Sequence, residues 1–332
     1  MKKNTARNSV NGEANGPPPS RWVRWIWMAG ALLLAGSPVW GQLRIVTTVG
    51  MVRDIAEAVA GPEAEVTGLM GSGVDPHLYK PTRGDVVALS QAEVILYNGL
   101  HLEGRMGEIF ERMERRDTPV LAVAKAALER AGREPLPGGD PHVWMDVFLW
   151  SHAVEAVADF LAAVDEENAA GYAERAAAYR RRLASLHAYG QEVMGSIPAG
   201  RRVLITAHDA FSYFGEAYGV EVRGIQGLST ESEAGVRDVE RLLDSIVRRG
   251  VPAIFVEDSV SDKNVRALVE GARARGRQLR IGGTLYSDAM GPEGSYTGTY
   301  IGMLDHNLTT ISRALGGSPP EGGFQGQHGK EN

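Results

Sequence analysis

The sequence predicts an α/β protein made of two lobes with parallel-type sheets, joined by one long rigid helix. Short β-branched segments alternate with helical segments in both halves of the chain, which is typical of βαβ units and a parallel sheet. Between the halves, residues 167–198 are rich in Ala, Arg, Glu and Leu and contain no proline before Pro198, which favours a continuous helix. The chain has 332 residues, of which 43% are hydrophobic, enough for two domains of common size.

In the first lobe, residues 42–166, strands are expected where β-branched residues cluster and helices where apolar residues recur at helical spacing. Gly61-Pro62 ends the first of these helices. The expected elements are, in chain order, strand 43–48, helix 51–60, strand 64–70, helix 82–91, strand 93–97, helix 104–115 and strand 120–124.

The second lobe, residues 199–316, repeats this alternation. Its expected elements are strand 202–206, helix 210–218, strand 220–223, helix 234–249, strand 252–257, helix 262–275, strand 278–281 and a last helix at 300–315. The connecting helix, 167–198, would contain about 28 residues and span about 42 Å, so we expect a strut that limits rotation of the lobes. Residues 317–332 are rich in Gly, Pro and polar residues, and we expect them to be disordered.

The first 41 residues predict a secretory signal peptide. Basic residues precede an 11-residue apolar run from Trp25 to Ala35, and small residues stand before the expected cleavage site between Gly41 and Gln42. A transmembrane helix needs about 20 apolar residues, so an uncleaved membrane anchor is the less favoured alternative. We therefore expect the mature chain in the periplasm or another extracytoplasmic compartment.

Charge and cysteine content exclude several classes of function. Removing residues 1–41 takes away five basic residues and one acidic residue, which leaves 30 Lys+Arg against 40 Asp+Glu and a net charge of −10. Such an acidic exported chain is a poor candidate for nucleic-acid binding. It has no cysteine, so disulfides and thiolate metal sites are excluded, and we expect no lipoprotein anchor at the signal boundary. A metal site would have to use histidines and carboxylates.

The tripeptide Asp-Pro-His occurs twice, ending at His77 and at His142. Pro fixes its own φ and keeps the residue before it out of the helical region, so each Asp-Pro forms a stiff corner that aims the following histidine. We expect both loops at the carboxyl ends of strands, where ligands bind in open α/β sheets. The same position is expected for His208, after the first strand of the second lobe, and for Asp288, after its last strand. Together, three imidazoles and one carboxylate suffice for one closed metal site.

Each of these residues also has a simpler explanation. A single histidine is more often structural than a ligand, His208 could cap the helix that follows it, and Asp288 stands in ordinary turn sequence. His101 also follows a strand, so spacing alone leaves it open as a ligand, whereas His152 and His187 fall at helical positions. The sequence contains neither a P-loop nor a Gly-x-Ser-x-Gly nucleophile elbow.

Six segments of the sequence together resemble one known family. They are GVDPHLYKPTRGD, NGLHLEGRMGEIF, DPHVWMDVFLW, VLITAHDAFSYFGEAYG, IFVEDSVSDKNV and GGTLYSDAMG. In this order they resemble the metal-binding solute-binding proteins of bacterial zinc and manganese ABC importers, known as cluster A-I or cluster 9, and within them the TroA-like branch. The resemblance covers residues 43–315, nearly the whole mature chain. It implies two α/β lobes joined by one long helix, with the metal between them.

Carried over residue by residue, the resemblance implies four metal ligands, which are His77, His142, His208 and Asp288. His101 is not a ligand in that pattern. Many zinc-selective members have a long His-rich loop before the second Asp-Pro-His, but here this segment, residues 128–139, is short and contains no histidine. Many manganese-selective members have Glu in place of His208. Three imidazoles and one carboxylate suit zinc in a tetrahedral site, whereas a bidentate carboxylate would suit manganese. Zinc is therefore the first expectation and manganese the second.

The predicted function is capture of a divalent transition-metal ion and its delivery to the permease of an ABC importer, without catalysis. We expect a monomer. We also expect carboxylates to hold the outer nitrogen of each imidazole, and the candidates are Asp146, Asp209 and Glu257. Two alternatives are a zinc-dependent hydrolase, which would need an open water position, and an adhesin or binding module stabilised by metal.

Overall fold

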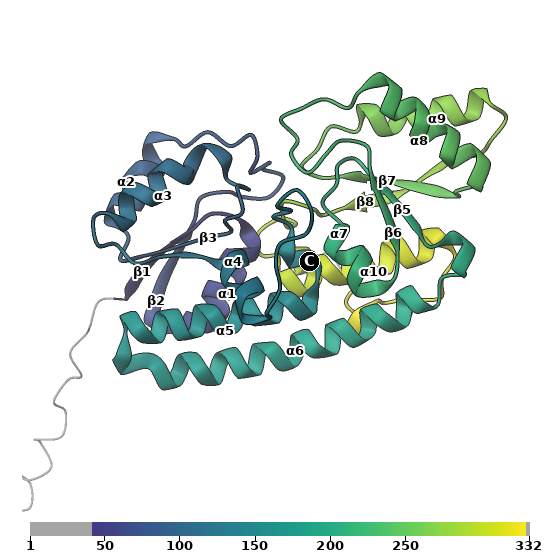
Figure 1. The fold of residues 1–332 in the computed structure, drawn as a ribbon. Helices are drawn as coiled ribbons and strands as arrows, with labels where there is room; N and C mark the ends of the chain where they lie inside the picture. The colour runs from purple at the N-terminus through teal and green to yellow at the C-terminus, as the bar shows by residue number, and fades with distance from the viewer. Residues whose placement is uncertain (1–41, 330–332) are drawn as a thin grey trace, which may run out of the picture. The chain divides into compact units, whose positions relative to one another are not determined.

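The computed structural model describes residues 42–329. The predicted signal peptide, residues 1–41, lies outside the described part of the chain, as do residues 330–332. The described residues belong to one compact unit, in which two groups of parallel strands are joined by a long helix (Figure 1). The predicted fold class, two α/β lobes with parallel sheets around one long helix, is therefore found.

The sheet of the first lobe has four strands, all parallel. They are β1 (Leu43–Thr47), β2 (Ala64–Gly68), β3 (Val94–Tyr97) and β4 (Val120–Ala122), in the order β2-β1-β3-β4. The middle strands β1 and β3 are buried, with Ile45 and Ile95 almost inaccessible, as is typical of β-branched residues at the centre of a parallel sheet. The strands alternate with helices α1 (Gly50–Ala60), α2 (Arg83–Gln91) and α3 (Gly107–Glu114).

Two helices of the first lobe have no counterpart among the predicted elements. α4 (Val123–Arg130) follows β4 without a loop, so the expected strand 120–124 ends early, at Ala122. α5 (Val147–Val164) is long and apolar enough to cross a membrane by length and composition, but half of it is buried and it packs against α4 and α6. Its apolar composition therefore reflects a position in the core.

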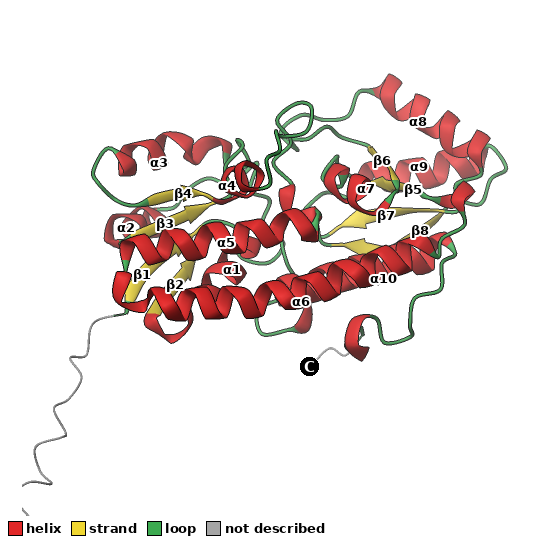
Figure 2. Cartoon of the chain, turned by 60° about the horizontal axis from the view of Figure 1, so that its bottom comes forward, coloured by secondary structure: helices red, strands yellow, loops and turns green. Residues whose placement is uncertain are grey.

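The long helix is α6 (Ala169–Gly195), with 27 residues or about 40 Å. A 3₁₀ turn, Glu166–Asn168, precedes it, so the α-helix is slightly shorter than the expected 167–198. Figure 2 shows α6 running alongside α5 and α10 (Tyr300–Leu315). It packs against α1 and α5 of the first lobe and against α7 (Ser212–Tyr218) and α10 of the second. α6 thus supports both lobes.

A buried carboxylate strengthens this support where α1, α6 and α10 meet. Asp54 on α1 accepts hydrogen bonds from the Tyr179 hydroxyl on α6 and from the Tyr300 N–H at the start of α10. Burial raises the pKa of Asp54, although both hydrogen bonds favour its ionised form. One side chain of the first lobe is therefore bonded both to the connecting helix and to the last helix of the second lobe.

The second lobe contains two parallel strand pairs, β5 (Val203–Thr206) with β6 (Glu221–Gly224) and β7 (Ala253–Glu257) with β8 (Arg280–Leu285). Helices α8 (Val236–Arg249) and α9 (Lys263–Ala274) pack against each other. β8 continues to Leu285, beyond the expected strand 278–281, and passes through Gly282. A Cβ atom at Gly282 would lie 2.7 Å from the Phe255 ring and 2.8 Å from Ala314 Cβ, so glycine here allows α10 to approach the strand closely.

The buried apolar residues form two clusters. The larger cluster joins the first-lobe sheet with α1, α5 and α6, and it also includes α10 residues such as Met303 and Leu304. The smaller cluster joins β5 and β7 with α8 and α9, through residues such as Ile205, Ile254 and Leu268. α10 follows the second-lobe strands in sequence but shares the core of the first lobe.

The C-terminal tail differs from the expected disorder. Phe324 is buried in the larger cluster, and its ring lies 5.5 Å from the Tyr189 ring on α6. The Phe324 N–H donates a hydrogen bond of 2.8 Å to the Asp305 carboxylate on α10. Phe324 and the bonds from Arg313 to the Pro320 and Glu321 carbonyls hold this Gly/Pro-rich segment against α10, and composition alone does not reveal this.

His328 in this tail should make stability depend on pH. Burial, together with the positive charges of His306 and Arg313, lowers the pKa of His328 to about 4, whereas an unperturbed histidine titrates near 6.5. The unfolded chain therefore binds a proton at this histidine at higher pH than the folded chain does. The contribution of neutral His328 to the free energy of unfolding is complete above about pH 6.5 and is lost as the pH falls toward about 4. We expect His328→Gln to reduce the pH dependence of the unfolding free energy in this window, measured by urea denaturation. An unchanged dependence would contradict the assignment.

Candidate metal centre

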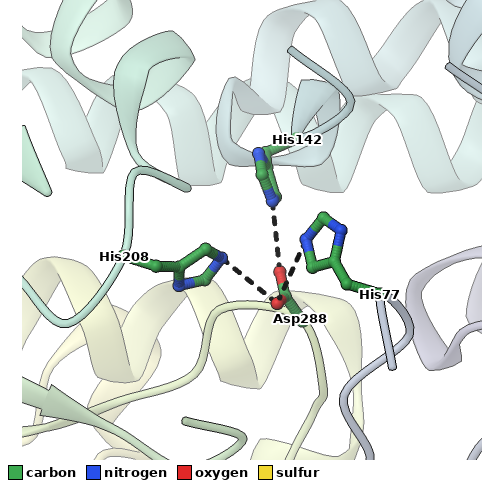
Figure 3. A group of neighbouring side chains, drawn as sticks. All are labelled: His77, His142, His208 and Asp288. Carbon is green, nitrogen blue, oxygen red and sulfur yellow. Dashed lines mark ion pairs between the residues drawn. The ribbon is translucent and has the colours of Figure 1, made fainter. Parts of the chain in front are cut away.

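Four side chains from four separate loops meet in the interior (Figure 3). They are His77, His142, His208 and Asp288, and one ligand atom of each lies within 4.8 Å of the others. The Nε2 atoms of His77, His142 and His208 lie 3.7, 3.4 and 3.2 Å from carboxylate oxygens of Asp288. The first lobe supplies two imidazoles, and the second lobe supplies the third imidazole and the carboxylate. The structure thus brings together all four residues predicted as ligands.

These polar atoms are buried without hydrogen-bond partners. The four residues are at most 5% exposed. Within residues 42–329, the Nε2 atom of each histidine and both carboxylate oxygens of Asp288 have no hydrogen-bond partner. An unpaired buried polar atom costs about 1–3 kcal/mol, so five in one place need an explanation. Figure 3 shows the imidazoles turned toward the carboxylate, an arrangement that a bound cation would satisfy.

Asp140 fixes the orientation of His142. Its Oδ1 accepts a hydrogen bond of 2.9 Å from the His142 backbone N–H and one of 2.7 Å from the His142 Nδ1. The ring is thereby held with Nε2 directed into the site. Sequence reasoning missed this role of Asp140, although the Asp-Pro-His motif places it two residues before the histidine.

The His142 loop does not directly follow a strand, contrary to the prediction, because α4 comes between β4 and this loop. Asn98, the first residue after β3, brings the loop to the sheet. Its Nδ2 donates a hydrogen bond of 3.0 Å to the carbonyl of Pro141. His142 therefore lies at the carboxyl end of β3 through a side-chain contact.

Glu257, the last residue of β7, fixes His208 as predicted. One carboxylate oxygen accepts from the His208 backbone N–H at 2.9 Å, and the other accepts from His208 Nδ1 at 2.6 Å. The other two carboxylates predicted to hold an imidazole lie elsewhere, which corrects the prediction. Asp146 caps α5 by accepting from the Phe148 N–H, and Asp209 accepts from the Ser212 hydroxyl at the start of α7. Asp146 is the N-cap of α5, a position where a carboxylate stabilises free N–H groups, whereas Asp209 lies three residues before α7.

Charge and burial act against each other in this site. Burial alone would raise the pKa of Asp288, but the positive charges that His208 and His142 can carry outweigh it and hold the pKa well below its ordinary value. Burial lowers the pKa of His77, and the other imidazoles add to this. Burial also disfavours charge on His208, but Asp288 and Glu257 raise its pKa well above the ordinary value. The carboxylate of the site is therefore ionised at neutral pH.

Trp144, two residues after His142, links the ligand loops of the two lobes. Its Nε1 donates a hydrogen bond of 2.9 Å to the carbonyl of Ser287, the residue before Asp288. The carbonyl of Trp144 accepts one of 2.7 Å from the Tyr300 hydroxyl on α10. Trp144 is fully buried. Sequence reasoning did not assign it a role, because no spacing rule connects residue 144 with residue 287.

His101 lies outside the cluster, in an exposed turn after β3. Leu100 and His101 both have positive φ, 55° and 64°. The buried carboxylate of Glu103 holds this turn by accepting from the Thr48 hydroxyl at 2.6 Å and from the Asn98 N–H at 2.7 Å. The turn therefore positions Asn98, which supports the His142 loop.

Two parallel α/β lobes on one long helix, with a buried cluster of three imidazoles and a carboxylate, define the class of metal-binding solute-binding proteins. The chain belongs to the family described as zinc-uptake complex component A, periplasmic (ZnuA), which it matches over residues 45–314. The resemblance stated from the sequence motifs is therefore confirmed. Members of this family are periplasmic or extracytoplasmic substrate-binding components of metal ABC transporters, and a membrane permease is the expected partner. They are not enzymes, so the family does not support the hydrolase or adhesin alternative.

Similar proteins agree with this assignment. The zinc-binding protein TroA of Treponema pallidum (strain Nichols) is 48% identical over 277 residues, which is 83% of this chain and 89% of that protein. The manganese-binding lipoprotein MntA of Bacillus subtilis (strain 168) is 43% identical over 284 residues, 85% of this chain and 92% of that protein. The solved structure of the periplasmic zinc-binding protein TroA from Treponema pallidum superposes with a TM-score of 0.79, covering 83% of this chain and 99% of that chain.

Proposed function

We propose that this chain is an extracytoplasmic receptor that captures a divalent transition-metal ion and delivers it to the permease of an ABC importer. The proposed ligands are His77, His142, His208 and Asp288. The observation that carries the proposal is the convergence of buried, unpaired Nε2 and carboxylate atoms on one point. Carboxylates hold the Nδ1 atoms of two of the imidazoles, as they commonly do in metal-ligating histidines.

Zinc is the ion that we propose first, with manganese as the second candidate. Three imidazole nitrogens and one carboxylate oxygen suit tetrahedral zinc, and most such sites prefer zinc over manganese. Both oxygens of Asp288 face histidines of the cluster, Oδ1 toward His142 and Oδ2 toward His77 and His208. If both bind, the coordination number rises to five, which manganese accepts well. The relatives named above include one zinc-binding and one manganese-binding protein.

We propose that export removes residues 1–41 and leaves a monomer without a lipid anchor, although the relative MntA is named a lipoprotein. The lack of cysteine supports the missing anchor, and the negative charge supports the lack of nucleic-acid binding. The mature chain would consist of a lobe at 42–166, a connecting helix at 167–198 and a lobe at 199–316. The intact mass and the sedimentation of the exported protein test this proposal. A mass increment the size of a lipid would contradict the missing anchor, and sedimentation as a dimer would contradict the monomer.

Metal analysis and competitive titration of the mature chain test the proposed function. We expect one tightly bound equivalent of zinc, and manganese binding that is weaker in competition. His77→Ala and His208→Ala should each weaken zinc binding by at least about 100-fold, since they remove a ligand. His152→Ala, which alters a half-buried histidine outside the cluster, is the matched control and should bind as the wild type does. Binding that survives both ligand substitutions would exclude this site.

A further inference from the structure

The two Asp-Pro-His loops use their aspartates differently. Asp140 Oδ1 accepts from both the backbone and the ring of His142. Asp75 Oδ1 accepts from the His77 backbone N–H at 2.9 Å, but its Oδ2 accepts a hydrogen bond of 2.6 Å from the Thr230 hydroxyl. Thr230 belongs to the second lobe. The aspartate of the motif therefore orients the imidazole in the His142 loop, whereas in the His77 loop it bonds to the other lobe.

Thr230 lies on a connecting segment between β6 and α8, residues 226–235, which we call the strap. The strap begins beside His208, where the Gln226 N–H donates to the Ala207 carbonyl at 3.0 Å and the Asp209 N–H donates to the Gly227 carbonyl at 3.2 Å. These bonds bracket His208 on both sides. A shift of the strap therefore acts on the His208 loop as well.

The strap also reaches the loop of His142. A Cβ atom at Gly138, which has a φ of 86°, would lie 2.8 Å from the Leu228 side chain, so Leu228 sits directly over this glycine. The residue before the strap, Ile225, belongs to the smaller apolar cluster, whereas both Asp-Pro-His loops lie on the first lobe with the larger one. One segment thus contacts the loops that carry all three histidines.

We propose that Thr230 is a positioning residue that couples closure of the lobes to retention of the metal, through Asp75 and the backbone of His77. This inference rests on the proposed metal site. When the lobes separate, the Thr230 hydroxyl leaves Asp75, and the loop that carries His77 loses this hydrogen bond to the second lobe. His77 is then the ligand whose position responds first to opening, because the Nδ1 atoms of the other two imidazoles are held by carboxylates within their own lobes.

The rate of zinc dissociation from the mature chain tests the proposal, measured by stopped flow with an excess of a chromogenic chelator. Thr230→Val keeps the shape of the side chain but removes the hydrogen bond to a charged group, and we expect dissociation about tenfold faster. Thr230→Ser retains the hydroxyl and should restore the wild-type rate. Ser229→Ala is the matched control, because among residues 42–329 the Ser229 hydroxyl has one hydrogen bond, accepted from the Glu231 N–H within the strap. A wild-type rate in Thr230→Val, or an equal increase in Ser229→Ala, would overturn the proposal.

Two further measurements separate a positioning role from a merely structural one. Thr230→Val should leave the melting temperature of the metal-free protein and the association rate of zinc near their wild-type values. In the Asp75→Asn background, Thr230→Val should add less than about a twofold change, because its partner charge is already absent. Fully additive effects would contradict the coupling through Asp75. If the wild type binds no zinc, the proposed function fails first, and if His77→Ala alone loses zinc while Thr230→Val does not accelerate its release, only this inference fails.

Discussion

Asp288→Ala is expected to weaken zinc binding by at least about 100-fold, the largest effect on affinity that we predict for a single carboxylate. Asp288 is the only acidic member of the cluster within residues 42–329, and its two oxygens face the Nε2 atoms of three histidines. Removing it leaves three neutral imidazole ligands for a divalent cation and no negatively charged ligand in the cluster. Competitive titration against a chelator of known affinity measures the loss.

Asp258 provides the control for this substitution. Its carboxylate lies near Asp288, and burial together with the charge of Asp288 raises the pKa of Asp258 to about 7. It does not belong to the cluster of possible ligand atoms. Asp258→Asn should therefore change zinc affinity by only a few-fold. If Asp288→Ala binds zinc within about tenfold of the wild type, the carboxylate is not a ligand, and the site is one of three histidines only.

Trp144→Ala is expected to lower the free energy of unfolding by about 3–5 kcal/mol, the largest effect on stability that we predict. The side chain is fully buried, and its ring centroid lies 5.2 Å from the His142 ring. Trp144→Phe keeps most of the packing but leaves the Ser287 carbonyl unpaired, at about 1–3 kcal/mol. Because Ser287 precedes Asp288, the Phe variant should also bind zinc about tenfold more weakly. Urea denaturation of the metal-free protein and zinc titration give the two values.

Trp150 is the control for the hydrogen bond of the Trp144 indole, because it lies in the same apolar core. It is also fully buried, but its Nε1 has no hydrogen-bond partner among the residues that the structure describes. Trp150→Phe removes an unpaired N–H and should be close to neutral for stability and for zinc binding. Equal losses in the two Phe variants would mean that ring volume, not the bond to Ser287, determines the effect of Trp144.

The sequence was sufficient to predict the order of most strands and helices, because short parallel strands alternate with amphipathic helices. α5 escaped this reasoning because its apolar residues do not keep to one stripe, since both α4 and α6 cover it. The end of β8 escaped it because Gly282 and Gly283 read as a loop, although they make room for α10. Local patterns predict elements well where a single face is buried, and poorly where packing comes from several sides.

The four site residues were proposed as a set from their expected strand-end positions and assigned as ligands by the family resemblance, and their common location is a property of the fold. They come from four loops that are up to 211 residues apart, from residue 77 to residue 288, and no local pattern measures such a distance. The groups that support them are harder still to predict. Glu257, Asp146 and Asp209 were predicted together from sequence, and within residues 42–329 Glu257 bonds the His208 ring, whereas Asp146 caps α5 and Asp209 bonds the Ser212 hydroxyl. Carboxylates near a histidine in sequence are thus ambiguous until the helix boundaries are known.

The continuous helix α6, packed on both lobes, has a consequence for the transport cycle. Under the proposed function, we expect this frame to hold the ligand loops close together before an ion binds, so that little of the binding free energy is spent on reorganisation. We expect the same frame to slow spontaneous release of the ion, because α6 is one continuous helix that packs on both lobes. Under the proposed function, the work for unloading would then come from the permease that receives the ion.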